Sequence, residues 1–562
     1  MTSMGKACAN FGALCLVAAA TVFLAATAQA GERPNILLIV ADDMAYSDLG
    51  SYGGEIDTPI LDALAKEGLR FSNFYVLPTC SPTRSALMSG NTNHVAGLGV
   101  MAEFIYPDIE GRPGYEGYLS DQVAALPEVL RDAGYNTYMS GKWHLGADDD
   151  RSPFRRGFER TFTMMQGGGS HWADMRPLTP SEPMIYRRNG QRIDDLPADF
   201  YSTWNYTDTL IEFIDADLQD GKPFFGYLSY TAPHDPLHAP AEYISKYDGK
   251  YDDGWDDLLN RRLAALQKIG LIPQDVSIPD NFLAPEWEAI SEEDKALFSR
   301  DMQVYAAMVD YLDMSVGRLF EYLRSVDQYD NTLIVFISDN GANGAPATAY
   351  PGNADGAYLA TFDNTPENRG LAGSFVDMGP GWARATAAPF RFFKSFTSDG
   401  GIRAPMIVRF PGGTKEKGGV TPALAHVSDL MPTFLDIAGA DYPDTYRGRN
   451  VIPPTGTSLR PVFEGIASDI RETGGIGYEL FEMKAFIQGH WKLSRLPKPF
   501  GTGGWELYDL SSDPGETLNL ANQHPERLSE MRDAWERFAR DNGIFDHQGH
   551  FDAIYRAIYG VK

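Results

Sequence analysis

Continuous runs of apolar residues, without alternating polar positions, mark the strands that this sequence predicts. A strand buried on both faces has this pattern, and such strands belong to parallel sheets covered by helices. Other segments carry apolar residues at helical spacing. One of them begins with Thr58-Pro59 and ends at Gly68, residues that favour the start and the end of a helix. We predict strands at residues 36–41, 136–140, 224–230 and 333–337, and helices at 59–67, 120–134 and 301–323.

The order of these segments predicts the fold class. Strands and helices alternate as far as residue 340, which is typical of an α/β domain with a large, mostly parallel sheet flanked by helices. The pattern changes after residue 440, where short strands at 477–487, 491–496 and 505–510 precede an amphipathic helix at 525–542. We therefore expect an α/β domain over residues 31–440 and a smaller α+β domain over residues 441–562.

The N-terminal residues predict export. Lys6 precedes an apolar stretch over residues 11–27, and Ala28-Gln29-Ala30 has the small-residue spacing of a signal-peptide cleavage site. We expect a signal peptide over residues 1–30 and a periplasmic or secreted protein. An uncleaved membrane anchor is the alternative. Later apolar runs are too short to span a bilayer, so we expect no stable membrane insertion after cleavage.

Cysteine content and net charge narrow the classes of function. Cys8 and Cys15 lie in the predicted signal peptide, so the exported chain keeps only Cys80. A lone thiol in an oxidising compartment is a liability unless it is buried or chemically used. The hydrophobic share of 43% excludes a disordered chain, and the net charge of −28 argues against a nucleic-acid partner. A small anionic substrate stays compatible, since a cationic pocket can lie inside an acidic protein.

Ionisable and amide side chains follow several of the predicted strands. Ligand sites of parallel α/β sheets lie at the carboxyl ends of strands, so these side chains are expected at one edge of the sheet. Two acidic or amide pairs among them offer only oxygen ligands, which suit Ca²⁺ or Mg²⁺ better than zinc or copper. Each pair by itself is equally typical of helix caps or solvated loops. The residues at this edge are Asp42, Asp43, Lys142, His144, His234, Asp339 and Asn340.

The segment Cys80-Ser81-Pro82-Thr83-Arg84 predicts an anion site at the start of a helix. Ser81 fits the N-cap and Pro82 the first helical position. The free N–H groups at such an end, together with the Arg84 guanidinium, suit a tetrahedral anion. The alternative is a buried structural thiol.

The same segment resembles the C-x-P-x-R motif of type I sulfatases, whose cysteine is oxidised to formylglycine. The similarity covers nearly the whole exported chain, with no departure at the matched positions, and is strongest to secreted bacterial arylsulfatases of the Pseudomonas type. It implies the alkaline-phosphatase-like fold. Further matches, in order, are the strand ending in Asp42-Asp43, Leu87-Met88-Ser89-Gly90, Gly141-Lys142-Trp143-His144-Leu145-Gly146, Ala232-Pro233-His234, Asp339-Asn340-Gly341, and Lys394 before Gly400-Gly401-Ile402-Arg403.

This resemblance implies a nucleophile, a cation and a maturation partner. A formylglycine-generating enzyme would convert Cys80, and the hydrated aldehyde would attack the sulfur of a small sulfate-ester substrate. Arg84 and Lys142 would position this diol and neutralise charge. Ca²⁺, with Mg²⁺ less favoured, would be bound by Asp42, Asp43, Cys80, Asp339 and Asn340.

The resemblance also implies the proton transfers. Asp339 would help to deprotonate the attacking hydroxyl, and His234 or Lys394 would protonate the leaving alcohol or phenol. His144 would then take a proton from the remaining hydroxyl, so that C–O cleavage releases inorganic sulfate. These roles agree with the residue chemistry, because an anionic ester needs cations and histidine titrates near neutral pH.

Two other functions remain open from the sequence. One is a phosphonate monoester or phosphodiester hydrolase of the same superfamily, and the other is a silent binding protein with an unmodified thiol. Which sulfate ester is cleaved stays open as well. We predict that His94, His171 and His238 are core residues, with the pocket wall as the alternative, and that His547 and His550 are surface residues. For the segment from His547 to Lys562, the sequence suggests packing on a neighbouring subunit.

Overall fold

A ten-stranded sheet forms the centre of the computed structural model, which describes residues 33–280, 282–411, 417–471, 474–545 and 549–559. Its strands are β1 (Asn35–Ala41), β2 (Leu69–Phe71), β4 (Asn136–Lys142), β5 (Arg160–Met164), β6 (Tyr186–Arg188), β7 (Gln191–Ile193), β8 (Phe224–Ser229), β9 (Thr332–Ser338), β10 (Met406–Arg409) and β11 (Gly419–Thr421). The order is β11-β2-β10-β9-β1-β8-β4-β5-β6-β7. The five strands from β9 to β5 are parallel, whereas β10, β6 and β7 pair antiparallel. The expected α/β class is confirmed.

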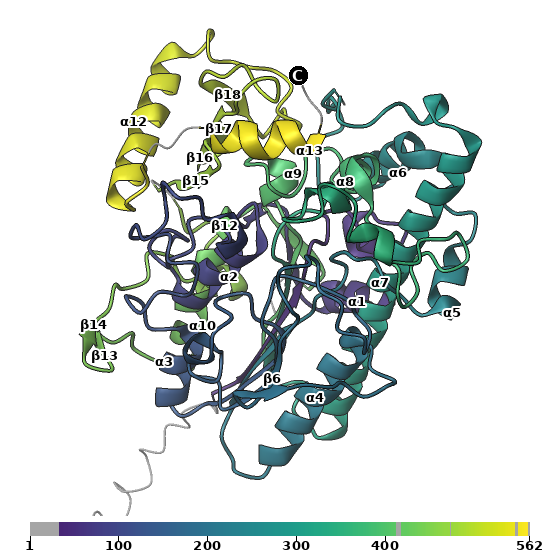
Figure 1. Ribbon diagram of the computed structural model, residues 1–562. Coiled ribbons are helices and arrows are strands. Elements are labelled where there is room, and N and C mark those ends of the chain that lie inside the picture. Colours follow the sequence, from purple (N-terminus) through teal and green to yellow (C-terminus); the bar gives the residue numbers. More distant parts are fainter. Residues whose placement is uncertain (1–32, 281, 412–416, 472–473, 546–548, 560–562) are drawn as a thin grey trace, which may run out of the picture.

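Helices cover both faces of this sheet (Figure 1). Leu37 and Ile39 of β1 enter the same core as helices α4 and α7, and the alternate residues Ile36 and Leu38 enter the core that contains α2 and α10. A strand with two apolar faces is buried on both sides, as its continuous apolar run predicts. The longer helices are α1 (Pro59–Glu67), α2 (Cys80–Ser89), α3 (Leu126–Asp132), α4 (Ser202–Asp217), α6 (Gly254–Lys268), α7 (Glu292–Ser325), α8 (Gly379–Thr386) and α10 (Leu430–Ala438).

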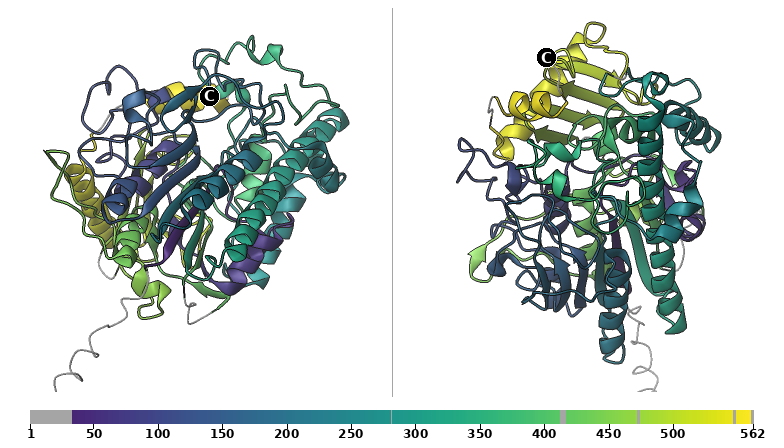
Figure 2. Two further views of the ribbon diagram at one scale, coloured as in Figure 1. Left: turned by 90° about the horizontal axis from the view of Figure 1, so that it is seen from below. Right: turned by 45° about the vertical axis from the view of Figure 1, so that its right-hand side comes forward.

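The C-terminal part forms a separate four-stranded antiparallel sheet, coloured yellow-green in Figure 1 and seen again from the side in Figure 2. Its strands β15 (Ile476–Leu480), β16 (Met483–Gln488), β17 (Trp491–Arg495) and β18 (Glu506–Asp509) are covered by α12 (Pro525–Asp541), whose Met531 and Trp535 pack on Leu493 and Leu507. Two-stranded ladders join β3 (Phe74–Tyr75) to β12 (Ala425–His426) and β13 (Thr445–Tyr446) to β14 (Arg449–Asn450). The remaining short helices are α5 (Ala241–Ile244), α9 (Asp399–Ile402), α11 (Arg460–Phe463) and α13 (Ala557–Tyr559).

Two helices differ in length from their predictions. Helix α3 begins at Leu126 and not near residue 120, because the Arg156 guanidinium binds the carbonyl oxygens of Leu119, Ser120 and Val123. Helix α7 begins nine residues before the predicted Asp301, at Glu292, where the Ser291 hydroxyl accepts a hydrogen bond from the Asp294 N–H. An N-cap of this kind satisfies one of the free N–H groups at a helix start.

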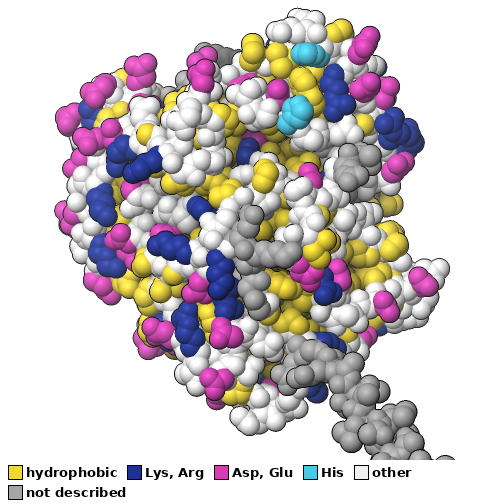
Figure 3. All heavy atoms as spheres, turned by 180° about the vertical axis from the view of Figure 1, so that it is seen from behind, with side chains coloured by type: hydrophobic (Ala, Val, Ile, Leu, Met, Phe, Trp, Pro, Cys, Tyr) yellow, Lys and Arg dark blue, Asp and Glu magenta, His cyan; other side chains and the backbone are white. Residues whose placement is uncertain are grey.

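The predicted signal peptide lies outside the described residues. Within the described ranges, no helix combines the length and the apolar character needed to cross a bilayer. On the face shown in Figure 3, basic side chains lie interspersed with acidic ones.

Candidate active site

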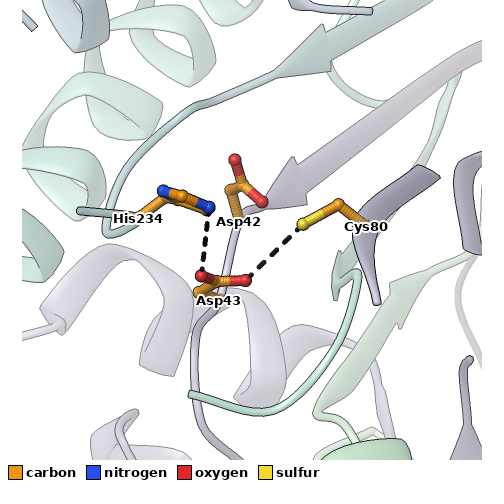
Figure 4. Close-up of side chains that lie close together, drawn as sticks. All are labelled: Asp42, Asp43, Cys80 and His234. Atoms are coloured by element: carbon orange, nitrogen blue, oxygen red, sulfur yellow. Dashed lines mark hydrogen bonds and ion pairs between the residues drawn. The ribbon is translucent and has the colours of Figure 1, made fainter. Parts of the chain in front are cut away.

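The carboxyl ends of four parallel strands bring the predicted polar residues together. Since β9, β1, β8 and β4 run in the same direction, their last residues meet at one edge of the sheet. Asp42 and Asp43 follow β1, Asp339 and Asn340 follow β9, Lys142 ends β4, His234 follows β8, and Cys80 and Arg84 lie in the first turns of α2. Figure 4 shows Asp42, Asp43, Cys80 and His234 turned toward one another. All of these side chains are buried.

The backbone around the site is tightly constrained. Asp43 has φ of 67° and His144 has φ of 55°, a left-handed conformation that non-glycine residues rarely adopt. Residues held in such conformations cluster at functional sites. A Cβ at Gly341 would lie 1.9 Å from the carbonyl oxygen of Gly400, so only glycine lets the chain after Asn340 approach the loop that follows Lys394.

Cys80 begins helix α2, whose N-cap is Thr79. The predicted N-cap Ser81 is wrong by two positions, because Thr79 is the last residue with extended backbone angles and Cys80 is already helical. The Cys80 thiol is fully buried, and its Sγ lies 3.7 Å from Asp43 Oδ1, to which it donates a hydrogen bond. Burial raises the pKa of this thiol well above its ordinary value, and Lys142 and Lys394 offset this only in part. An unmodified Cys80 is therefore a neutral thiol and a weak nucleophile.

Three basic side chains form ion pairs with the carboxylates of the site. Arg84 donates two hydrogen bonds to Asp339 Oδ2, at 2.7 and 2.9 Å. Lys142 Nζ lies 2.6 Å from Asp42 Oδ2, and Lys394 Nζ lies 2.7 Å from Asp43 Oδ2. Burial alone would lower the pKa values of both lysines, but the neighbouring carboxylates raise them above the ordinary value. Both lysines are therefore held as ammonium ions.

Two buried oxygen atoms of the site lack a hydrogen-bond donor. Asp42 Oδ1 and Asn340 Oδ1 accept no hydrogen bond, although both residues are fully buried. Asp43 Oδ1, which accepts from Asn340 Nδ2 at 2.6 Å, lies beside them. One ligand atom each of Asp42, Asp43, Cys80 and His234 lies within 4.8 Å of the others. Buried oxygens without donors are costly, and a hard cation satisfies them, so the residues fit Ca²⁺ or Mg²⁺.

His234 was predicted only as a proton donor, but the structure also places it beside the oxygen cluster. Its Nδ1 contacts the carbonyl oxygen of Asp235 at 2.6 Å, and its Nε2 lies 3.5 Å from Asp43 Oδ2. Burial lowers its pKa well below the ordinary value, and the charge of Lys394 lowers it further. The ring is therefore a neutral imidazole, and its Nδ1–H donates to Asp235.

Glu103 is a residue of the site that sequence reasoning missed. Its Oε1 lies 2.9 Å from Nε2 of His144, whose Nδ1 is buried and accepts or donates no hydrogen bond. Burial, the largest single influence, would raise the pKa of Glu103, but the contacts with His144, a backbone hydrogen bond and the charge of Lys142 together outweigh burial and lower it to about 2. Gly167 backs the imidazole, because a Cβ there would lie 2.7 Å from the His144 ring. The His144 ring is thus fixed from two sides.

A cavity of about 100 Å³ opens from this cluster toward the surface. Cys80, His144, His234 and Lys394 line its closed end, so four of the predicted site residues face the same space. The rest of its wall is largely apolar. Residues with this geometry can bind a small anionic group at the charged end and an apolar group along the wall.

The other histidines have structural partners. His171 contacts the carbonyl oxygen of His234 at 3.1 Å, and His238 contacts that of Ser374 at 2.9 Å, so both support the chain behind the site. His94 Nε2 lies 3.3 Å from Glu479 Oε2. The surface prediction for His550 is wrong, because this residue is buried against Asp108. His547 lies outside the described residues.

The C-terminal residues have a partner within their own chain. Ile554, Tyr555, Ile558 and Tyr559 line its cavity, whereas packing on a neighbouring subunit stays a prediction. Their spacing of three and four positions is typical of one helix face, and this was the signal available in the sequence.

Comparison with known proteins identifies the family. The sequence model described as Sulfatase matches residues 34–440, and the one described as N-sulphoglucosamine sulphohydrolase, C-terminal, matches residues 390–538. The chain belongs to the sulfatase family and is a hydrolase of sulfuric esters.

Its relatives agree with this assignment. The chain is 42% identical to an uncharacterized sulfatase of Schizosaccharomyces pombe, over 91% of this chain and 94% of the relative. It is 40% identical to an arylsulfatase of Klebsiella aerogenes, over 80% of this chain and 96% of the relative. The crystal structure of Ps i-CgsB with k-i-k-neocarrahexaose superposes with a TM-score of 0.65 at 23% identity, covering 94% of this chain and 98% of that one, and confirms the fold.

Proposed function

We propose that this chain hydrolyses sulfate monoesters of aryl or alkyl alcohols to the alcohol or phenol and inorganic sulfate. In this proposal Cys80 is converted to formylglycine, and the resident cation is Ca²⁺ in preference to Mg²⁺. The observation that carries the proposal is the pair of donor-free buried oxygens, Asp42 Oδ1 and Asn340 Oδ1, beside a buried cysteine at the charged end of an apolar cavity. The Klebsiella relative, named an arylsulfatase, supports the same reaction class.

The charge balance of the site suits this chemistry. Three carboxylates contact three basic side chains, with Arg84 reaching both Asp339 and Asp42, and the six charges sum to zero. When present, the cation supplies positive charge and the hydrated formylglycine supplies the hydroxyl nucleophile. A divalent cation then gives the site two positive charges, which balance the ester anion and the negative charge that develops on the nucleophile.

Two groups of residues have different tasks. Arg84 and Lys142 hold the carboxylates of Asp339 and Asp42 in place, so they fix the oxygen cluster. Lys394 both binds Asp43 and lines the cavity. Its ammonium therefore holds a proton at the point where the leaving oxygen of the ester departs, and we assign it the general-acid role. His234 is the other residue that the sequence offered for this role, but its ring is neutral and its Nδ1–H is donated to Asp235, so Nε2 has no proton to give and Lys394 is preferred.

His144 is assigned to the second half of the reaction, in which sulfate is released. The Glu103 carboxylate occupies Nε2, so Nε2 carries a hydrogen and Nδ1 is the free basic nitrogen. Nδ1 then accepts a proton when the sulfate leaves. Glu103 acts through His144 and is a positioning residue.

Maturation and export complete the proposal. Residues 1–30 would direct export to the periplasm or the medium and would be removed. A formylglycine-generating enzyme would act on the chain before Cys80 is buried. Sequencing of the N-terminus of the exported protein tests the first point, since a mature start at or near Gly31 is expected and a retained Met1 would contradict it.

The experiment that tests the reaction begins with Cys80 itself. Mass spectrometry of the tryptic peptide of residues 71–84, from protein exported by a native host, should give the mass of an aldehyde in place of the thiol. Turnover of 4-nitrophenyl sulfate should exceed that of a phenyl phosphonate monoester. A phosphonate preference would make the chain a phosphonate hydrolase, and an intact thiol without turnover would make it a binding protein.

A further inference from the structure

The last described residues of the chain form one wall of the cavity. This C-terminal segment (residues 549–559) contains a short π-helical turn (Asp552–Arg556) and α13, which lies above α9 in Figure 1. Four of its side chains, Ile554, Tyr555, Ile558 and Tyr559, line the cavity. Ile554 and Tyr555 are buried, at 7% and 1% exposure. The segment is thus part of the wall of the candidate active site.

Aromatic contacts and one hydrogen bond hold the segment in place. Tyr555 and Phe551 stack with ring centroids 4.6 Å apart, and both pack on Phe500. The Tyr555 hydroxyl donates to the carbonyl oxygen of Ser395, the residue after Lys394. The segment is therefore fixed to the loop that carries the proposed general acid.

A second contact ties the start of the segment to another wall of the cavity. The imidazole of His550 stacks on Tyr106 at 4.3 Å and contacts Asp108 at 2.8 Å. Tyr106 and Asp108 follow Glu103 and Phe104, which line the cavity. The segment thus spans from the Glu103 loop to the Lys394 loop.

The surface facing the segment is also mostly apolar, and one of its polar side chains, Asn343, is already engaged. Met101, Phe104, Leu178 and Pro351 face the same space. Asn343 donates to Asp235 and Tyr350, and its Oδ1 accepts from the Ala345 N–H. A sugar in this space would bury hydroxyl groups with few partners, which is costly, whereas an alkyl or aryl group gains from burial.

We propose that the C-terminal segment is a specificity-determining wall, which binds the apolar part of the leaving alcohol through Ile554 and Ile558 and discriminates against sulfated sugars. The inference rests on the proposed sulfatase function and adds the feature that selects the ester. Ile558 is the residue on which to test it, because it lines the cavity, is partly exposed and belongs to none of the sequence motifs of the site.

The test uses n-alkyl sulfates of two, four and six carbons with the full-length, formylglycine-containing enzyme. The leaving-group basicity is nearly constant in this series, so differences in kcat/KM report contacts with the chain. Each methylene that enters the wall should raise kcat/KM by about fourfold, the equivalent of about 0.8 kcal/mol. The rise should stop when the cavity is filled. A kcat/KM independent of chain length would overturn the proposal.

Two variants of equal shape test whether the C-terminal segment contacts the leaving group. Ile558→Val and Ile558→Thr remove the same volume, but Thr places a hydroxyl in the wall. Ile558→Thr should lower kcat/KM for the six-carbon ester about fivefold or more relative to Ile558→Val, since an unpaired buried hydroxyl is costly. The two-carbon ester should be unaffected. Equal losses on both esters, or no difference between Val and Thr, would show that the segment is structural only.

The outcomes separate this inference from the proposed function. Turnover of glucosamine 6-sulfate with kcat/KM above that of hexyl sulfate would overturn the proposed specificity of the C-terminal segment but not the proposed sulfatase function. Failure to cleave any sulfate ester, with Cys80 converted to the aldehyde, would overturn the proposed function itself. Thermal unfolding of both Ile558 variants confirms that each is folded before kinetics are compared.

Discussion

Replacing Glu103 by glutamine tests how the candidate site controls a proton. Glu103 and Gln have the same shape, so Glu103→Gln keeps a side chain beside His144 and removes the charge. The pKa of Glu103 falls from 4.5 to about 2 although burial opposes this, because His144 lies 2.9 Å away. This lowering corresponds to about 3 kcal/mol of net stabilisation of the Glu103 carboxylate by its surroundings, that is, about 100-fold in a rate that depends on that carboxylate.

The effect should appear in one half of the reaction only. If His144 takes its proton when sulfate leaves, kcat should fall by about 100-fold while kcat/KM, which reports the first half, changes by less than about threefold. With 4-nitrophenyl sulfate the variant should then release a burst of nitrophenol equal to the concentration of enzyme. Stopped-flow absorbance measures this burst. Glu110→Gln, an exposed position near the same loop, is the matched control and should show neither effect.

Two results would refute this reasoning. An equal fall in kcat and kcat/KM would assign the pair to the first half of the reaction. A loss that persists in full when Glu103→Gln is added to His144→Ala would show that Glu103 does not act through His144. The pH dependence supplies a further check. Since the folded pKa of Glu103 lies below its ordinary value, its stabilising effect is complete above about pH 4.5 and is lost as the pH falls toward 2. The melting temperatures of Glu103→Gln and the parent enzyme should therefore converge only in strong acid.

Other predictions concern the metal ion, the general acid Lys394 and Gly167. Chelation should abolish activity and Asp339→Ala should lose both turnover and bound calcium, measured by atomic emission; full activity of the metal-free enzyme would contradict the assigned ligands. Lys394→Met should slow alkyl sulfates by about 1000-fold and activated aryl sulfates by about 10-fold, since only poor leaving groups need the proton; equal losses across a series of substituted phenyl sulfates would exclude that role. Gly167→Ala should lower kcat by about 10-fold or more with little effect on KM, because its Cβ displaces the His144 ring; unchanged kinetics in a folded variant would show that the ring has room to move.

The sequence predicted the charged half of the site better than the apolar half. Asp42, Asp339 and Lys142 follow buried strands, and the parallel sheet forces strand ends together, so local pattern and topology were sufficient. Glu103 lies on a loop with no periodicity and no strand before it, and only its tertiary contact with His144 reveals it. The cap of α2 was misassigned because Ser81 and Pro82 are good start residues, whereas Thr79 begins the helix through its backbone angles and not through a side-chain hydrogen bond.

The packing partner of the C-terminal segment was harder to predict for a different reason. The spacing of Phe551, Tyr555 and Tyr559 predicts an apolar helix face, but periodicity does not say which surface covers it. Its partner Phe500 is distant in the sequence, and Ser395 contributes only a backbone oxygen. Contacts of that kind cannot be predicted from the identities of the residues.

The burial of Cys80 beneath a cavity that the last residues close has a consequence for the timing of synthesis. Roughly 470 residues separate Cys80 from the C-terminal segment. At about 5–20 residues per second, the ribosome reaches that segment some 25–95 s after Cys80 has been joined to the chain. During this interval the wall that residues 549–559 provide does not yet exist. Any enzyme that must reach the Cys80 side chain thus has a period set by translation speed, and slower elongation of the second half of the message would lengthen it.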